Sequence, residues 1–291
     1  MKNMKKLLAL TSLILLTNCI FAGGDENEIK NFRFGLKVTP SLNWYKPDGK
    51  IIEKNGISPK FGGGLVLEFR LAKVASVQTG VQIDMDGGKI KYNNGGITVP
   101  NANIVSYFYN NSDDVIEPYG LTPPTDSTNL YAFNQKYTLY QLNERTYKAT
   151  YITIPLLLKL KTKEIGMMTY FGQFGINNSF RWSVKADDKL TALSGSSIGA
   201  TESKSKINVS KDASFYAASL AFGGGVEMNF SGTTSLLLGI NYNLGFTNVV
   251  KSQSDYLRRN TNNSTGTGSD LSQLPQTLKS NAVVLTIGVL F

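Results

Sequence analysis

The chain has no histidine, and its single cysteine, Cys19, lies near the N-terminus. Without histidine it has no Ser-His-Asp or Cys-His catalysis, no His-ligated metal and no usual general base near neutral pH. Cys19 falls in a segment that we expect to be removed, and its loss excludes disulfides, thiol nucleophiles and Cys-based metal sites. Few enzyme classes survive both absences, so we expect neither catalysis nor a bound cofactor or metal.

Long apolar runs are also missing, except at the N-terminus. Met1–Lys6 contains three lysines, Leu7–Leu16 is almost entirely apolar, and the small residue Ala22 follows. This order predicts a secretory signal peptide over 1–22 and a mature domain over 23–291. In an alternative reading, Leu16–Cys19 resembles a lipoprotein processing site and leaves Cys19 lipidated. The mature domain has no apolar run of about 18 residues, so no membrane-spanning helix is predicted.

Basic residues exceed acidic ones, but they are scattered. The formal charge of +9 falls to +6 when the three lysines of the signal peptide are removed. Nucleic-acid binding normally needs clustered Lys and Arg, so no nucleic-acid partner is expected. An exported chain more often meets anionic lipid, such as lipopolysaccharide phosphates, although soluble loops would explain the charge equally well.

The mature sequence instead shows apolar and polar residues in alternation, which is the period of a β-strand with two different faces. Eight segments have this pattern and are long enough to cross a bilayer as tilted strands. They are Phe32–Val38, Lys60–Leu71, Ala75–Met85, Tyr147–Lys161, Met168–Arg181, Tyr216–Phe230, Ser235–Phe246 and Asn281–Phe291.

The connections between these segments alternate strictly between short and long. The short ones lie around Lys73, at Lys163-Glu164 and at Ser231–Thr234. The long, polar ones span roughly Lys46–Pro59, Gly87–Arg145, Val184–Ala213 and Thr247–Leu278. This asymmetry predicts an all-β fold, an eight-stranded antiparallel up-and-down transmembrane β-barrel with short periplasmic turns and long extracellular loops.

The composition of the two strand faces indicates which face meets lipid. One face carries Leu, Ile, Val and Phe, whereas the other is too polar for a dry core, so the apolar face is expected outward. Seven charged residues then fall inside: Arg33, Lys37, Glu68, Arg70, Asp84, Lys159 and Glu227. Eight strands enclose little more than side chains. We therefore expect these charges to pair and plug the barrel, the alternatives being an ion path or an acid/base site at Glu68, Asp84 and Glu227.

Two further patterns are consistent with a membrane barrel. Aromatic residues near strand ends predict interfacial girdles: Trp44-Tyr45, Tyr92, Tyr147, Tyr151 and Trp182 on the loop side, and Phe32, Phe69, Phe230 and Phe291 on the turn side. Phe61–Gly64 and Phe222–Gly225 share the letters Phe-Gly-Gly-Gly. Glycine relieves crowding where a narrow barrel curves, although a chance match is an equal explanation.

The long connections are the expected place for binding. The second contains Tyr107–Tyr109, Asp113-Asp114, Tyr119, Pro123-Pro124 and Tyr131, which suits a protein, a glycan or calcium, or a mobile surface loop. The fourth contains the low-complexity stretch 260–268, which we expect to be flexible. Beside it, Arg258-Arg259 is a candidate contact for lipopolysaccharide phosphate.

Short motifs resemble the PorT-like outer-membrane β-barrel family. They are Phe34–Asn43 (FGLKVTPSLN) and, above all, Tyr151–Leu160 (YITIPLLLKL). The ending Val289–Phe291 resembles the aromatic signal that the barrel-assembly machinery recognises, with Phe291 as the assembly signal. The resemblance implies a small barrel of the outer membrane. It also hints at protein secretion, to which the family's namesake is linked.

The resulting hypothesis is a non-enzymatic outer-membrane barrel with a binding, adhesion or envelope-structural role. Its expected partners are outer-membrane lipid, lipopolysaccharide, the barrel-assembly machinery and a protein at the long loops. One alternative is an accessory component of an outer-membrane secretion system. Another is a narrow channel for ions or small solutes.

Overall fold

The computed structural model describes residues 32–94, 104–194, 197–231, 234–261 and 270–291. The predicted signal peptide, with Cys19, lies outside these ranges, as does most of the low-complexity stretch 260–268. Within them, no helix is both long and apolar enough to span a membrane.

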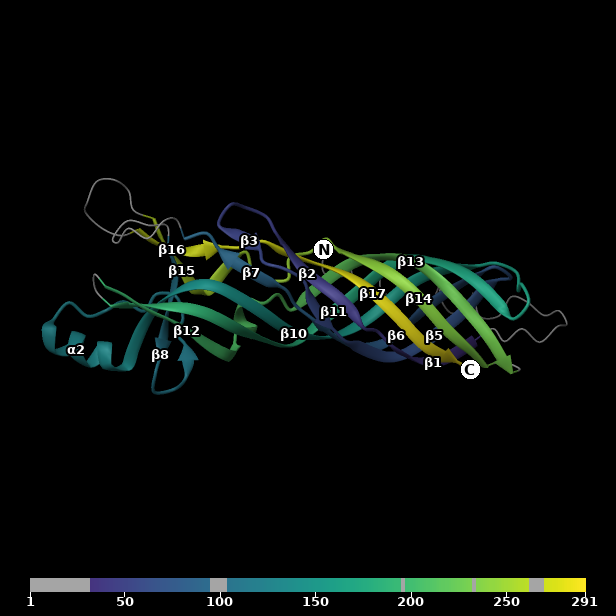
Figure 1. Cartoon of the computed structure of the whole chain (residues 1–291), viewed down its shortest axis with the longest axis horizontal. Coiled ribbons are helices and arrows are strands. Elements are labelled where there is room, and N and C mark those ends of the chain that lie inside the picture. The colour runs from purple at the N-terminus through teal and green to yellow at the C-terminus, as the bar shows by residue number, and fades with distance from the viewer. Residues whose placement is uncertain (1–31, 95–103, 195–196, 232–233, 262–269) are drawn as a thin grey trace, which may run out of the picture.

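Antiparallel pairings close a ring through eight strands (Figure 1). In ring order they are β1 (Phe32–Val38), β5 (Gly62–Ala72), β6 (Ala75–Asp86), β10 (Tyr137–Lys161), β11 (Met168–Ser194), β13 (Tyr216–Ser231), β14 (Thr234–Gly245) and β17 (Leu278–Leu290), which pairs with β1 again. Each of these strands overlaps one of the eight predicted segments, so the prediction of an all-β antiparallel barrel is confirmed, and its ring runs through eight strands. The short turns all lie at the end where β1 begins and β17 ends.

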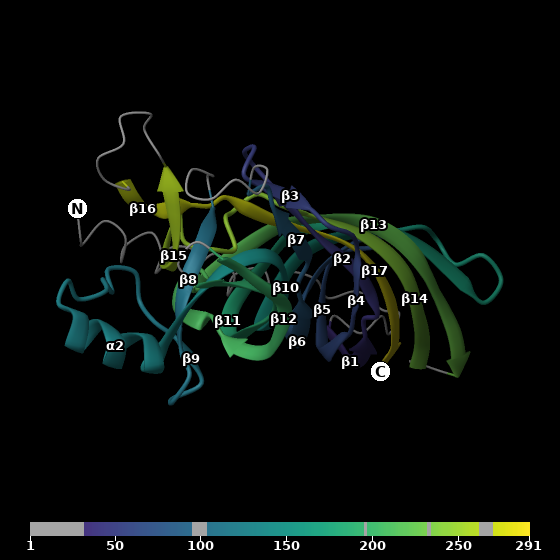
Figure 2. The ribbon, with the colours of Figure 1, turned by 60° about the vertical axis from the view of Figure 1, so that its left-hand side comes forward.

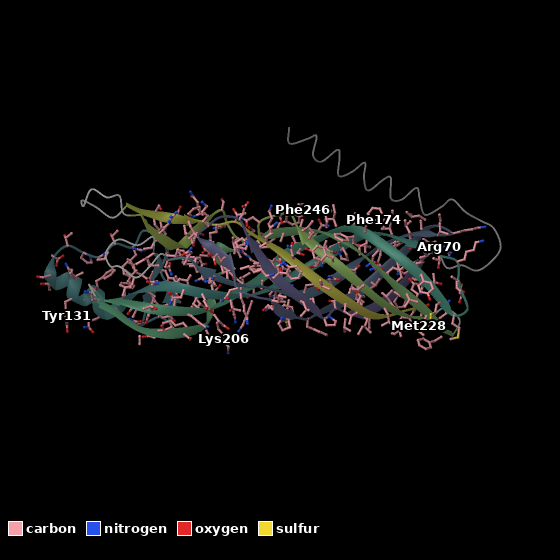
Figure 3. The ribbon with its side chains drawn as sticks, turned by 45° about the horizontal axis from the view of Figure 1, so that its top comes forward. Arg70, Tyr131, Phe174, Lys206, Met228 and Phe246 are labelled. Atoms are coloured by element: carbon pink, nitrogen blue, oxygen red, sulfur yellow. The ribbon has the colours of Figure 1, made fainter. Side chains whose placement is uncertain are left out.

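The two faces of the strands have the predicted orientation. Apolar side chains such as Leu36, Ile83 and Leu156 are more than half exposed on the outside, and Phe174 and Phe246 point away from the barrel in Figure 3. Polar side chains such as Gln78, Thr153 and Asn241 are buried inside. This arrangement is stable only when the outer surface faces lipid, because water would favour the reverse.

The long connections are not simple loops, which corrects the sequence-based expectation. Strands β10 and β11 have 25 and 27 residues and continue well beyond the barrel. Around them lie shorter elements: β2 (Ser41–Pro47), β3 (Ile52–Lys54), β4 (Ser58–Lys60), β7 (Lys89–Tyr92), β8 (Val105–Asn110), β9 (Val115–Ile116), α2 (Ser127–Lys136), β12 (Ser197–Asn208), η1 (Ser210–Asp212), β15 (Gln253–Thr261) and β16 (Asp270–Pro275).

We call the part beyond the barrel, built from β3, β7–β9, α2, β12, η1, β15, β16 and the outer halves of β10 and β11, the head. Figures 1 and 2 show it as a β-rich body at the end opposite the short turns, with α2 outermost. Asp126 caps α2, because its carboxylate accepts a hydrogen bond of 2.8 Å from the backbone N–H of Asn129.

The apolar and polar faces exchange places where the strands leave the barrel. On the barrel part of β10 the buried residues include Thr153 and Lys159, but on its head part they include Tyr140 and Leu142. The head part of β11 likewise buries Val184, Ala186 and Leu190. Together with residues of β7, β8 and β15, these side chains form one apolar core inside the head. The barrel is thus polar inside, whereas the head is apolar inside, as in a water-soluble protein.

This exchange corrects part of the predicted aromatic girdle on the loop side. Trp182 is 73% exposed, and Phe215, whose backbone oxygen accepts from the N–H of Arg181, is exposed beside it, as an interfacial girdle requires; Phe246 is exposed as well. In contrast, Tyr45, Tyr92, Tyr147 and Tyr151 are all buried, at 1–6% exposure. They point inward, into the head core or the top of the barrel interior, and do not contact lipid.

Candidate functional site

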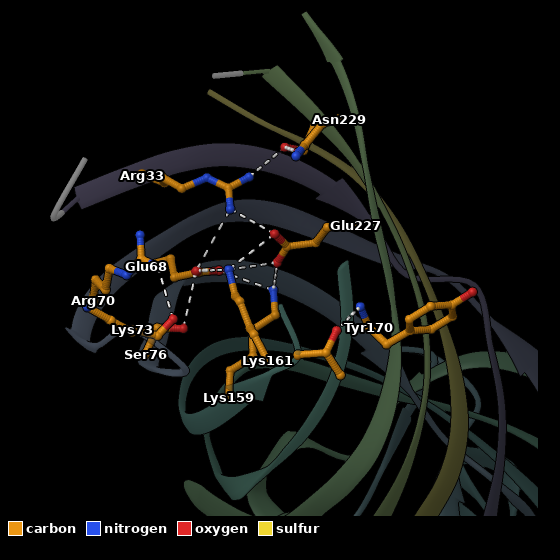
Figure 4. Close-up of polar contacts among 12 residues, drawn as sticks. Arg33, Glu68, Arg70, Lys73, Ser76, Lys159, Lys161, Tyr170, Glu227 and Asn229 are labelled. Carbon is orange, nitrogen blue, oxygen red and sulfur yellow. Dashed lines mark hydrogen bonds and ion pairs between the residues drawn. The ribbon is translucent and has the colours of Figure 1, made fainter. Parts of the chain in front are cut away.

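Five charged side chains meet inside the barrel near the short turns (Figure 4). We call Arg33, Glu68, Lys159, Lys161 and Glu227 the ionic cluster. Arg33 donates to Glu227 at 2.7 Å and Lys159 to Glu68 at 3.1 Å. Lys161 lies 3.0 Å from Glu227, and further contacts join Lys159 to Glu227 and Lys161 to Glu68. The residues come from β1, β5, β10 and β13, so the cluster ties together strands on different sides of the ring.

Neighbouring groups complete the coordination of this cluster. Ser76 donates to Glu68 at 3.2 Å, and Arg33 donates to the hydroxyl of Ser235 at 2.9 Å. The ammonium of Lys159 lies 4.2 Å from the ring centre of Phe171, a cation–π distance. Phe171 fits there because Gly225 has no side chain: a Cβ on that residue would lie 2.7 Å from the Phe171 ring. Packing therefore explains a glycine of the second Phe-Gly-Gly-Gly segment, because Gly225 leaves room for the ring of Phe171.

The structure does not bring together all seven predicted interior charges. Arg33, Glu68, Lys159 and Glu227 belong to the ionic cluster, whereas Arg70 is half-buried at the turn and donates to the backbone oxygens of Ala72 (3.3 Å) and Lys73 (3.0 Å). Lys37 and Asp84 lie higher in the barrel, where Gln82 donates to Asp84 at 2.5 Å. Conversely, the sequence-based list omitted Lys161, although it shares the polar face of its strand with Lys159.

Above the ionic cluster the barrel interior contains a polar cavity of about 90 Å³. Its lining includes Thr39, Asn43, Gln82, Asp84 and Asp86. The amides of Asn43 and Gln82 donate to Asp86 and Asp84, so their own oxygens are left for the cavity. Such oxygens need donors, and a cavity of this size and polarity suits several waters.

The head core contains a fully buried ion pair. Arg145 donates to the two carboxylate oxygens of Asp188 at 2.8 and 2.7 Å, and both side chains are 0% exposed. The Tyr107 hydroxyl adds a third donor to Asp188 at 2.9 Å. Burial by itself would lower the pKa of Arg145, but the Asp188 carboxylate outweighs it and raises that pKa. Breaking a buried pair of this kind is costly, so the pair fixes how β8, β10 and β11 pack.

A second buried carboxylate, Asp212, links η1 to β15. Ser254 and the backbone N–H of Asp255 donate to it, the latter at 2.6 Å. Burial raises the pKa of Asp212, and these hydrogen bonds only partly offset the effect.

The polar candidates of the long connections also have structural partners. Arg258 is buried, donates to the backbone oxygen of Leu121 at 3.0 Å and lies 4.4 Å from the Phe108 ring centre. Its predicted contact with lipopolysaccharide is therefore wrong. Asp113 accepts from Asn110 at 2.7 Å, and Asp114 accepts from Tyr109. Among the described residues, no group of three or more His, Cys, Asp or Glu side chains is placed to hold a metal ion.

These contacts limit the chemistry of the interior. The carboxylates of Glu68 and Glu227 are held by cations, and Asp84 and Asp86 by amides, so each already has a partner. The interior supports structure and hydration, and the head is the part that presents a folded surface to the exterior.

Comparison with known proteins gives a family and a set of structural neighbours. A family model described as "Outer membrane protein beta-barrel domain" matches residues 21–251. Neisserial surface protein A has 10% identity and a TM-score of 0.38, over 90% of this chain and 96% of that chain. Ail of Yersinia pestis has 11% identity and a TM-score of 0.27, over 90% of this chain and 100% of that one. OprG of Pseudomonas aeruginosa has 9% identity and a TM-score of 0.38, over 89% and 95%. No curated protein matches the sequence.

Proposed function

Since the chain belongs to the outer membrane protein beta-barrel domain family and lies in the outer membrane, we propose that it is a closed barrel that holds a binding head at the cell surface. The observation that supports this role most is the exchange of faces along β10 and β11. A loop that only connects strands needs no core, whereas this head has one and is fixed to the barrel by two continuous strands. Binding residues are commonly carried on such rigid scaffolds.

A channel is the less favoured role, because two barriers lie in series along the barrel axis. The ionic cluster lies across the barrel near the short turns, where Lys159 is 0% exposed between Glu68 and Glu227. The apolar head core covers the other end. We expect the refolded protein to give no discrete current steps in planar bilayers. Regular single-channel steps from the wild-type chain would contradict the closed-barrel proposal.

The binding role can be tested by site-specific photocrosslinking on whole cells. A crosslinker replaces Tyr131 on α2, which is 70% exposed, or Val115 on β9, which is 46% exposed. The matched control replaces Leu156, which is 56% exposed but lies on the lipid-facing side of β10. We expect the same protein or glycan adduct from both head positions and none from position 156. Equal labelling at all three positions, or none in the head, would exclude a specific head partner.

A closer kinship with PorT-like barrels, and with it an accessory role in secretion, is the alternative proposal. It is supported by the resemblance of Phe34–Asn43, which spans β1 and the start of β2, and of Tyr151–Leu160 in the barrel part of β10. Co-purification of secretion components with the intact barrel would favour this role over adhesion.

The export steps are also proposals. The sequence supports removal of 1–22 and recognition of Phe291 by the barrel-assembly machinery. Phe291 is 41% exposed, its ring centre lies 5.6 Å from that of Phe34, and its N–H donates to the backbone oxygen of that residue. N-terminal sequencing of the protein from outer membranes should begin at Gly23.

A further inference from the structure

Pairs of lysines oppose each other directly across the sheet at two places on the outer face. Lys148 on β10 is the register partner of Lys185 on β11, and Lys46 on β2 is the partner of Lys279 on β17. Residues in register lie about 5 Å apart at Cβ, so each pair brings two like charges together. Such an arrangement is unfavourable unless an anion neutralises it. We call Lys148/Lys185 and Lys46/Lys279 the lysine pairs.

Each lysine pair follows closely after a tryptophan in the sequence. The chain has two tryptophans, and each precedes one pair: Trp44 is two residues before Lys46, and Trp182 is three residues before Lys185. Tryptophan marks the membrane–water interface. On β6, the exposed Met85 pairs with Thr150, so Lys148 lies two residues, or about 7 Å, beyond the edge of the apolar surface. The lysine pairs are therefore at the level of the lipid headgroups.

Two lysines farther out in the head are paired with protein carboxylates. Lys91 lies 2.9 Å from Glu53, and Lys189 lies 3.0 Å from Glu144. In the lysine pairs, Lys148 contacts Asp187, but no carboxylate among the described residues lies within 4.0 Å of Lys46, Lys185 or Lys279. Among the described residues, the four ammonium groups of the lysine pairs thus have a single carboxylate contact, that of Lys148 with Asp187.

Lys60 and Lys89 make the surroundings of Lys148 more basic. Lys89 is exposed on β7 and pairs in register with Thr146, which is two residues from Lys148 on the same face. Lys60 is close enough to Lys89 and Lys148 for their charges to interact. The carboxylates in reach are Asp86, which already accepts from Asn43 and Ser280, and Asp187. Positive charge therefore remains in excess here.

We propose that each lysine pair binds a phosphate group of an outer-leaflet lipid between its two ammonium groups. Phosphate oxygens accept strong charge-assisted hydrogen bonds, and a bridging phosphate removes the repulsion within the pair. The two pairs are on different strands, Lys148/Lys185 on β10 and β11 and Lys46/Lys279 on β2 and β17, so the protein binds at least two lipid molecules. This inference depends on the membrane position of the barrel and is independent of the head's partner.

The test measures binding of diphosphoryl lipid A to the full chain refolded in neutral detergent, with native mass spectrometry to count bound lipids. The variants are Lys148→Gln/Lys185→Gln, Lys46→Gln/Lys279→Gln and their combination. The matched control is Lys91→Gln/Lys189→Gln, which removes the same charge from neutralised lysines. A lysine near an anionic surface contributes enough that each double variant should lose about 10-fold or more in affinity. The control should stay within about 2-fold.

Four further measurements make the outcome decisive: an arginine variant, a folding check, lipid A without phosphates and competition by inorganic phosphate. Lys148→Arg/Lys185→Arg should retain binding, which separates loss of charge from loss of folding, and resistance to SDS before boiling shows that every variant has folded. Lipid A stripped of its phosphates should bind weakly to the wild type. Equal loss in the control, unchanged binding of the stripped lipid, or displacement of lipid A by millimolar inorganic phosphate would each overturn the proposal.

Discussion

At the residue scale, the buried charges of the ionic cluster hold together the strands around the barrel interior. Glu68 and Glu227 each contact both Lys159 and Lys161, and Arg33 joins from the first strand. A charge in such a place is stable only with its partners, and removal of one leaves the others uncompensated. The cluster therefore joins strands that are distant in sequence, and in our proposal it also closes the barrel to solutes.

Lys159→Met tests this view of the ionic cluster. The side chain is 0% exposed, so its loss leaves the buried carboxylates of Glu68 and Glu227 with fewer cations. We expect the free energy of unfolding to fall by about 3 kcal/mol, measured by urea titration in detergent micelles. Lys163→Met, in the exposed turn, is the control and should change it by less than about 0.5 kcal/mol. Equal free energies of unfolding for the two variants would show that the ionic cluster does not stabilise the fold.

Asp212 gives a prediction about pH. Burial raises its pKa above the usual 3.8, so the folded head binds this proton more tightly than the unfolded chain does. The stability from this group is therefore full below pH 3.8 and is lost as the pH rises through the raised pKa. Asp212→Asn should remove that decline when resistance of the head to protease is followed between pH 3 and 7.

Asp187 provides the matched comparison for Asp212. Its partial burial would raise its pKa, but the hydrogen bonds from Lys148 and from the backbone N–H of Lys206, together with the charges of Lys148 and Lys60, outweigh burial, and the pKa is lowered. Its contribution is therefore lost as the pH falls, which is the opposite direction. If Asp187→Asn and Asp212→Asn change the pH profile in the same direction, the assigned causes are wrong.

At the element scale, one strand serves two environments. The barrel part of β10 exposes Ile154, Leu156 and Leu160, whereas its head part buries Tyr140, Leu142 and Tyr147. The strand keeps its pairing with β11 throughout, with two register shifts, at Leu142/Glu144 and at Thr150/Tyr151. The shift at Thr150/Tyr151 lies where the strand leaves the lipid, and the adjacent Trp182 is 73% exposed.

Leu156→Arg and Tyr131→Arg distinguish lipid from water as the solvent of each part. Both side chains are exposed, at 56% and 70%. An arginine on the lipid face near the middle of a barrel costs about 2–4 kcal/mol, so Leu156→Arg should fold poorly into vesicles, as shown by mobility on a gel before and after boiling. Tyr131→Arg on α2 should cost less than about 0.5 kcal/mol. Similar costs for the two variants would contradict the assigned boundary.

At the scale of the whole molecule, two interiors of opposite character are stacked along one axis. The barrel is stabilised by outer contact with lipid and by polar contacts inside, whereas the head is stabilised by its apolar core and by Arg145–Asp188. Because these interactions differ, the two parts should differ in what unfolds them.

Asp188→Asn tests whether the two parts can be separated. It leaves Arg145 buried with an incomplete partner, which should cost about 3–5 kcal/mol within the head. We expect protease to cut the head of this variant in membranes, while the barrel still resists SDS before boiling. Asp126→Asn is the control, since asparagine caps a helix as well as aspartate does. Loss of the barrel together with the head would show one cooperative unit.

The sequence by itself determined the barrel. Alternation with period two places every other side chain on one face, and this local rule identified the eight strands, their outward face and Lys159 and Glu227 as inward charges. The same rule places Lys161 inward, although Lys161 is not among the seven interior charges predicted from the sequence. The period-two alternation is strong because lipid requires apolar side chains along the whole outer surface of the barrel.

Only the tertiary structure decided what the long connections do. Their apolar residues, such as Val105, Tyr107 and Ile116, are separated by polar ones and show no single period, because they pack from short strands at different angles into a shared core. Likewise, the sequence suggests that Arg258 is a surface charge, whereas in the fold its side chain contacts Phe108 and Leu121. The cross-strand lysine pairs depend on register, which arises from the pairing of distant segments and is not written in any one of them.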